Sequence, residues 1–154
     1  MSTSDLSIVP QQLVTNALIK ALRDAGPGKT ILDHPYQVEK PSYPYLAVFA
    51  IPGGSFSGPP LTAPDADAEL IYQLDAIGTR RDQAQAMGDW AAGVVVGREA
   101  SGLFRVSFED IPGWKVADRM PTDTTPGGVE VVPAATTLYR DTRRFTLALT
   151  PQGT

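Results

Sequence analysis

The order of helical and strand-like periodicity along the chain constrains its fold more than any other feature. Apolar residues at spacings of one, three and four predict two amphipathic helices, at residues 10–25 and 80–96. Alternating or continuous apolar segments predict strands at residues 29–38, 45–51, 68–77, 103–109, 114–118, 129–132 and 137–150. This order predicts an α+β fold, in which an antiparallel or mixed β-sheet has two α-helices packed on one face.

The second helix is expected to begin with a side-chain cap and to pack closely against a neighbour. Thr79 stands just before it and Asp82 follows three residues later, which is the spacing of a capping box. Gly88 and Gly93 each weaken a helix by up to about 1 kcal/mol relative to alanine. Glycines kept inside a helix at this cost indicate a closely packed partner.

Residues 52–66 are rich in proline and glycine and cannot be regular structure throughout. Prolines cannot donate to a strand ladder, and glycines lose more freedom than other residues when they are ordered. The segment is expected to form a long projecting Pro/Gly loop or an open hairpin that carries Gly53, Gly54 and Phe56. Long loops on compact domains tend to be functional, so these residues are candidates for contact with another protein.

Length and composition indicate one globular domain. At 154 residues the chain can bury roughly 70% of its unfolded surface in one core. We expect a single domain over residues 1–154, with a flexible N-terminus (1–8) and a C-terminal tail (151–154). The formal net charge of −4 gives no overall attraction to nucleic-acid phosphate. The sequence shows neither a membrane-spanning apolar run nor a signal peptide, so a soluble protein that is not secreted by that route is expected.

Each motif that could carry chemistry fails at a named position. The run at 26–30 resembles a phosphate-binding loop, but Arg23 stands where the signature needs its first glycine, and the run closes a helix instead of opening one. The run at 54–58 resembles a nucleophile elbow, but its centre is Phe56 instead of serine. The chain has no cysteine and one histidine, His34. We therefore expect no catalytic residue, no cofactor and no metal site, and hence no enzyme.

Three carboxylates alternate along the chain around the start of the third strand. Asp65, Asp67 and Glu69 resemble the opening of a calcium loop, but Leu70 and Ala76 stand where that loop needs glycine and a bidentate glutamate. In an extended chain the three side chains project on one side, at intervals of about 7 Å. They form either a solvated face or an acidic strip that faces a positively charged neighbour or a DNA channel.

Basic residues gather at two places in the chain. Arg80 and Arg81 stand at a helix N-terminus, where the helix dipole disfavours positive charge by roughly a few tenths of a kcal/mol. Arg140, Arg143 and Arg144 lie in the last predicted strand. A solvated surface is the default for both groups. The unfavourable position of the first group indicates an acidic partner, for which the carboxylates at residues 65–69 of a neighbouring subunit are the candidate.

Several segments together resemble a known family. They are YPYLAV at 43–48, IPGG at 51–54, YQLDAIGTRRDQA at 72–84, RFTL at 144–147 and TP at 150–151. Together with the amphipathic N-terminal helix, they make the chain similar to the tail terminator proteins of long-tailed bacteriophages (siphoviruses), especially those that infect actinobacteria. The resemblance spreads over most of the chain and has no single signature motif.

The resemblance implies a virion structural protein. Such subunits form a homohexameric ring that caps the tail tube, ends its polymerisation and presents a surface to the head-completion or connector protein. DNA passes through the lumen without specific binding, and the ring becomes part of the virion neck after assembly in the host cytoplasm. The glycine- and proline-rich segment at 112–133 has no counterpart in the family pattern, and an extra loop at the ring surface is one interpretation of it.

The expected contact residues come from the Pro/Gly segment, the acidic strip and the arginines. They are Gly53, Gly54, Phe56, Asp65, Asp67, Glu69, Arg80, Arg81, Arg140 and Arg144. Alternatives to the terminator role are another neck component, such as a head–tail connector or stopper, and a tail-tube subunit. A ligand-binding module or enzyme built on the loop at 53–60 is a further, different class.

Overall fold

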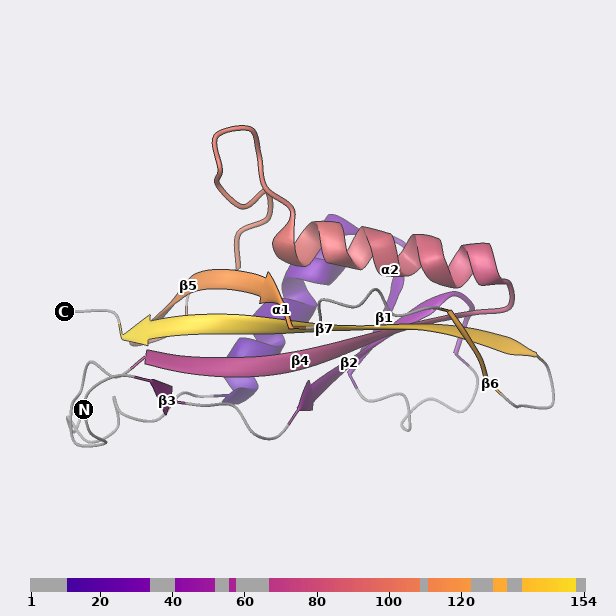
Figure 1. Ribbon diagram of the computed structural model, residues 1–154, viewed down its shortest axis with the longest axis horizontal. Coiled ribbons are helices and arrows are strands. Elements are labelled where there is room, and N and C mark those ends of the chain that lie inside the picture. The colour runs from indigo at the N-terminus through magenta and orange to yellow at the C-terminus, as the bar shows by residue number, and fades with distance from the viewer. Residues whose placement is uncertain are drawn as a thin grey trace.

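The computed structural model describes residues 11–33, 41–51, 56–57, 67–108, 111–122, 129–132 and 137–151, with the backbone alone for Phe56, Ser57 and Asp67. A sheet and two helices form two layers (Figure 1). In chain order the elements are α1 (Gln11–Ala25), β1 (Thr30–Asp33), β2 (Tyr45–Ile51), β3 (Phe56–Ser57), β4 (Asp67–Gly78), α2 (Arg81–Val96), β5 (Trp114–Pro121), β6 (Glu130–Val132) and β7 (Leu138–Pro151). No helix among these residues is long and apolar enough to cross a membrane.

The sheet is mixed and is centred on its two longest strands. Its order is β1-β2-β4-β7-β5, with β3 added to β4 and β6 added to β7. The β1–β2 pair is parallel and the remaining pairs are antiparallel. β4 and β7 run beside each other from Ala68 opposite Leu149 to Gly78 opposite Tyr139. The predicted α+β class with a mixed sheet is confirmed.

Both helices cover the same face of the sheet, as the periodicity predicts. The buried stripe of α1 includes Val14, Leu18 and Leu22, and that of α2 includes Met87, Ala91 and Val95. These stripes meet alternate residues of the two central strands, namely Tyr72 and Leu74 of β4 and Phe145, Leu147 and Leu149 of β7. In Figure 1, α2 runs alongside these long strands and α1 crosses them at a steep angle. The residues that alternate with these along each strand point to the opposite side of the sheet, which we call the outer face.

A buried hydroxyl pair links α1 to the sheet. The Thr15 and Tyr72 hydroxyl oxygens are 2.9 Å apart, and Thr15 Oγ1 also donates to the Gln11 carbonyl. Burial raises the pKa of Tyr72, and the hydrogen bond with Thr15 lowers it by a smaller amount. The phenol therefore remains protonated and able to donate at neutral pH. The pair satisfies a polar atom on a ring that is otherwise part of the apolar core.

Replacing Tyr72 with phenylalanine is expected to lower the free energy of unfolding by about 1 kcal/mol, the usual net contribution of one hydrogen bond. The loss is limited because Thr15 Oγ1 keeps its bond to the helix backbone. Urea denaturation monitored by circular dichroism measures it. Tyr43, which is 42% exposed, supplies the control, and Tyr43→Phe is expected to change stability by less than about 0.5 kcal/mol. A Tyr72→Phe variant as stable as the wild type would mean that the hydroxyl pair contributes nothing net.

The start of α2 differs from the capping prediction. The N-cap is Arg80, not Thr79, and it makes no side-chain cap bond. The Thr79 backbone N–H and hydroxyl instead donate to Gln83 Oε1, at 2.9 and 3.2 Å. The helix begins one residue later than a Thr79 cap requires. Gln83, its third residue, therefore reaches back to Thr79 and takes over part of the capping.

The predicted strand at 103–109 is wrong. Within the described residues 97–108, only an isolated bridge forms, between Arg98 and Phe104. The Glu99 N–H donates to the Leu103 carbonyl, and Gly102 turns the chain with a φ of +90°. Of the apolar residues that suggested a strand, Val106 and Phe108 pack against the core from a loop, whereas Leu103 is 69% exposed.

The segment at 112–133 is not one extra loop. Trp114–Pro121 form β5 at the edge of the sheet, and Glu130–Val132 pair with β7 as β6, while residues 123–128 lie outside the described part. A register shift between Val116 and Asp118 bulges β5. Its proline is tolerated because Pro121 is the last residue of an edge strand, where a missing N–H costs no ladder bond.

Candidate interaction surfaces

The structure describes some of the predicted contact residues only in part. Gly53, Gly54 and Asp65 lie outside the described residues, and so does His34. The Phe56–Ser57 backbone pairs antiparallel with Asp67 and Ala68 at the start of β4. The rest of the Pro/Gly segment, residues 52–55 and 58–66, lies outside the described residues, so the choice between a loop and an open hairpin stays a prediction.

Three predicted contact residues lie on the outer face, spread along its length. Glu69 of β4 and Arg140 and Arg144 of β7 share this face, because Glu69 pairs with Ala148, Arg144 with Gln73 and Arg140 with Ile77. The Asp67 backbone has the same parity as Glu69. The strand period therefore places these residues on the side of the sheet opposite the helices.

A chain of polar contacts crosses the centre of the outer face. Arg144 Nε donates to Gln73 Oε1 at 3.0 Å, and Gln73 Nε2 donates to Asp75 Oδ1 at 3.1 Å. Asp75 is only 6% exposed, whereas Arg144 is exposed. The nearby Asp75 carboxylate contributes to the raised pKa of Tyr45 on β2, although burial is the larger cause. Acidic, basic and neutral polar groups thus alternate across neighbouring strands.

Arg140 extends this surface toward β6. Its Nη2 donates to Glu130 Oε2 at 2.8 Å, and this bond is the main reason why the pKa of Arg140 is raised. Its Nε is buried and has no hydrogen-bond partner among the described residues. The ion pair is partly exposed, so we assign it at most about 1 kcal/mol. Its effect is to fix the orientation of Arg140 on the outer face.

Arg80 and Arg81 are placed away from the acidic residues at the start of β4. They follow the C-terminal end of β4, whereas Asp67 and Glu69 lie at its beginning, about 30 Å away along the strand. Both arginines are exposed, and Arg80 Nε lies 3.3 Å from Asp82 Oδ1. The distance of about 30 Å excludes a direct contact, within one subunit, between these arginines and the acidic residues at the start of β4.

The sequence analysis missed Arg119, on the helix-covered face of β5. This guanidinium is 7% exposed and lies between two aromatic rings, 4.4 Å from the Phe104 centroid and 3.8 Å from the Phe108 centroid. Arg98 stacks on the same Phe104 ring at 4.1 Å. The two arginines and two phenylalanines therefore alternate in one stack, which we call the Arg–Phe stack. No local sequence signal predicts it, because the loop and β5 meet only in the tertiary structure.

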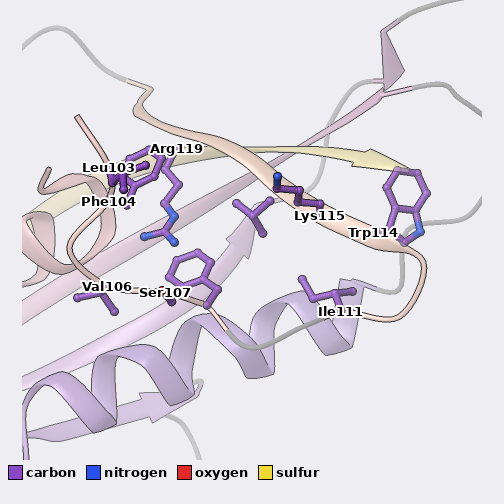
Figure 2. A pocket seen from close by; sticks show the side chains of 10 residues that line it. Leu103, Phe104, Val106, Ser107, Ile111, Trp114, Lys115 and Arg119 are labelled. Carbon is purple, nitrogen blue, oxygen red and sulfur yellow. The ribbon is translucent and has the colours of Figure 1, made fainter. Parts of the chain in front are cut away.

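A cavity of about 420 Å³ lies between the loop and β5, beside the Arg–Phe stack. Its lining is Leu103, Phe104, Val106, Ser107, Phe108, Ile111, Trp114, Lys115, Val116 and Arg119. Figure 2 shows the Arg119 side chain leaving the strand and reaching toward the segment that carries Val106 and Ser107, with Trp114 at the far end. Most of the lining residues are aromatic or aliphatic, and the two cations among them are Arg119, which is buried, and Lys115, which is exposed.

No metal-binding cluster is present in the part of the chain that the structure describes. No three His, Cys, Asp or Glu side chains there are grouped so that they could hold a metal ion. The run at 26–30 closes α1 and leads into β1, so it has the opposite context to a phosphate-binding loop. No protein-family model matches this sequence, and no curated protein matches it either.

Proposed function

We propose that this protein is a ring-forming structural subunit of a phage neck, with the role of a tail terminator. The observation that carries the proposal is the outer face, on which Glu69, Arg140 and Arg144, each selected from the sequence as a contact residue, all lie. The family resemblance supplies the role: the ring caps the tail tube, ends its polymerisation and binds the head-completion protein. No chemistry is required of any residue.

The layout of the charged groups supports assembly by head-to-tail contacts. Such a contact joins one surface of a subunit to a different surface of its neighbour, and it closes into a ring when the rotation between subunits closes. Arg80 and Arg81, at the start of α2, lie about 30 Å from the start of β4, because the strand separates them. The two groups cannot contact each other within one subunit, but they can between neighbouring subunits.

The mixed charge of the outer face fits a surface that does not hold DNA. Strong phosphate binding needs clustered lysine and arginine side chains, with each contact adding to the release of counterions. On this face the basic groups alternate with carboxylates and amides, and Arg140 is already paired with Glu130. If the face lines the lumen, DNA can pass along it without being retained.

Electron microscopy of the concentrated, purified protein tests the assembly. We expect closed rings one subunit thick. Open-ended tubes would contradict a terminator and indicate a tube subunit. Particles that remain single subunits under chemical cross-linking at high concentration would contradict a self-assembling ring.

The contribution of the outer face is tested by comparing Arg144→Gln with Lys20→Gln. Each variant removes one exposed positive charge, the first from the outer face and the second from α1 on the opposite side of the sheet. We expect sedimentation velocity to show fewer assembled particles for Arg144→Gln alone. Equal assembly of both variants would place the subunit contact away from this face.

A further inference from the structure

We propose that the cavity between β5 and the loop at residues 97–108 binds a single carboxylate carried on an apolar group, with Arg119 as its partner. The source of this carboxylate is either a free organic acid or an acidic side chain of a protein segment with apolar neighbours. The proposal does not depend on the ring function. It depends on the hydrogen-bonding state of Arg119 and on the chemistry of the lining.

Arg119 is buried without the partners that a guanidinium normally has. It carries five N–H donors, and its only described bond is a long one, 3.4 Å from Nη1 to the Val95 carbonyl. Its Nε has no hydrogen-bond partner among the described residues, and no described carboxylate lies within ion-pair distance. A buried cation left in this state costs free energy, so an unpaired guanidinium facing a cavity indicates a missing anion.

The Arg–Phe stack determines the direction from which an anion can approach. The rings of Phe104 and Phe108 occupy the faces of the guanidinium. The N–H donors of Arg119 lie in the guanidinium plane, so a hydrogen-bond partner must approach at the edge of that plane. A carboxylate approaching in this plane can accept two parallel N–H bonds, which is the geometry that arginine favours.

The guanidinium keeps its positive charge at neutral pH although it is buried. Burial, with a smaller contribution from the Arg98 charge, lowers the pKa of Arg119 to about 10. Arg98 does not compensate for the missing anion, because it is a second cation and is itself paired with Asp118 at 3.0 Å. A bound carboxylate would neutralise a charge that, among the described residues, meets two aromatic rings but no anion.

The lining selects a monoanion with an apolar body. Apart from Arg119, the polar side chains of the lining are Ser107 and Lys115, both exposed, and the rest is aromatic or aliphatic. One buried guanidinium balances one negative charge, whereas a phosphate dianion requires more. Leu103, 69% exposed at the rim, offers a further apolar contact to whatever carries the carboxylate.

Binding is tested with 3-phenylpropionate and its neutral analogue 3-phenylpropanamide. In ¹H–¹⁵N spectra we expect the acid to shift the Arg119 Nε–H and Trp114 indole signals saturably, because both residues line the cavity. The amide is expected to bind at least about tenfold more weakly, since it lacks the charge that strengthens a bond to arginine. Equal effects of acid and amide would overturn the proposal, as would no effect of the acid. Tighter binding of inorganic phosphate than of the acid would overturn the ligand class.

Peptide probes distinguish the two sources. The comparison uses acetyl-Leu-Glu-Leu-amide and its glutamine counterpart. Glutamate-dependent shifts at Arg119 support a protein segment as the source, and binding of 3-phenylpropionate alone supports a free acid. If neither carboxylate perturbs Arg119, the proposal fails.

Two sets of variants check the role of Arg119. Arg119→Met keeps the apolar stem in the stack and is expected to weaken 3-phenylpropionate binding by at least tenfold. Arg105→Met, at an exposed residue of the loop at 97–108, is expected to leave the binding unchanged.

In the second variant, Glu109 and Asp110, which lie outside the described residues, are changed together to Gln and Asn, and unchanged binding is expected. Binding at least tenfold tighter in that variant would identify the chain's own carboxylates as the occupant and overturn an external one. If Arg119→Met does not fold, the comparison of acid and amide on the wild type still decides the question.

Discussion

Replacing Arg143 with alanine is expected to lower the free energy of unfolding by about 3–5 kcal/mol, because it leaves a buried carboxylate without its cation. Asp141 is 1% exposed on the helix-covered face of β7. Arg143 holds both of its oxygens, with Nε 3.2 Å from Oδ1 and Nη2 3.0 Å from Oδ2. These hydrogen bonds are the main cause of the raised pKa of Arg143.

Asp141→Ala is expected to lower the free energy of unfolding by less than Arg143→Ala does. Asp141→Ala leaves Arg143, whose side chain is 28% exposed and keeps its 2.6 Å contact with Asp89. The double substitution Arg143→Ala with Asp141→Ala is expected to recover part of the loss seen for Arg143→Ala alone, since removing both partners leaves no buried charge. Urea denaturation of the three variants measures the differences. A loss for Asp141→Ala equal to that for Arg143→Ala would show that burial of the carboxylate is not the cause.

Replacing Gly88 with alanine is expected to destabilise the protein by about 1–3 kcal/mol, although alanine is the better helix former. A Cβ at this position would lie 2.6 Å from Asp141 Oδ2 and 2.9 Å from its Cγ. The carboxylate cannot move away easily, because it is buried and held by Arg143. Here the clash outweighs the gain in helix propensity.

Gly93 provides a matched control in the same helix. It is exposed, and a Cβ there would meet nothing within 4 Å. Gly93→Ala is therefore expected to stabilise the protein by about 0.5–1 kcal/mol, through helix propensity and a less flexible unfolded chain. Thermal and urea unfolding of both variants test the pair. If both substitutions changed the free energy of unfolding in the same direction, the contact between α2 and β7 would not constrain Gly88.

Gly88 and Gly93 show how much the sequence could predict about the packing of α2. Both glycines weaken α2, and the prediction of a close packing partner holds for Gly88 but is wrong for Gly93. Their sequence context does not separate them, because the difference arises from the buried side chain on β7 that faces only one of them. Likewise, Asp141 and Arg143 interrupt the apolar parity of β7, and only the packing of α2 shows that they form a pair on the covered face.

The sequence by itself determined the α+β class, the face to which most residues belong and the order of strands and helices apart from the segment at 103–109, because periodicity is a local property of the chain. Glu69, Arg140 and Arg144 share a face because of the parity within each strand and the pairing of β4 with β7. The recognised catalytic motifs are excluded by single residues, such as Arg23 and Phe56. The tertiary structure decided which side of the sheet the helices cover and where the loop before β5 lies. It also placed Arg119 between two rings, since those contacts join β5 to the loop over the sheet edge.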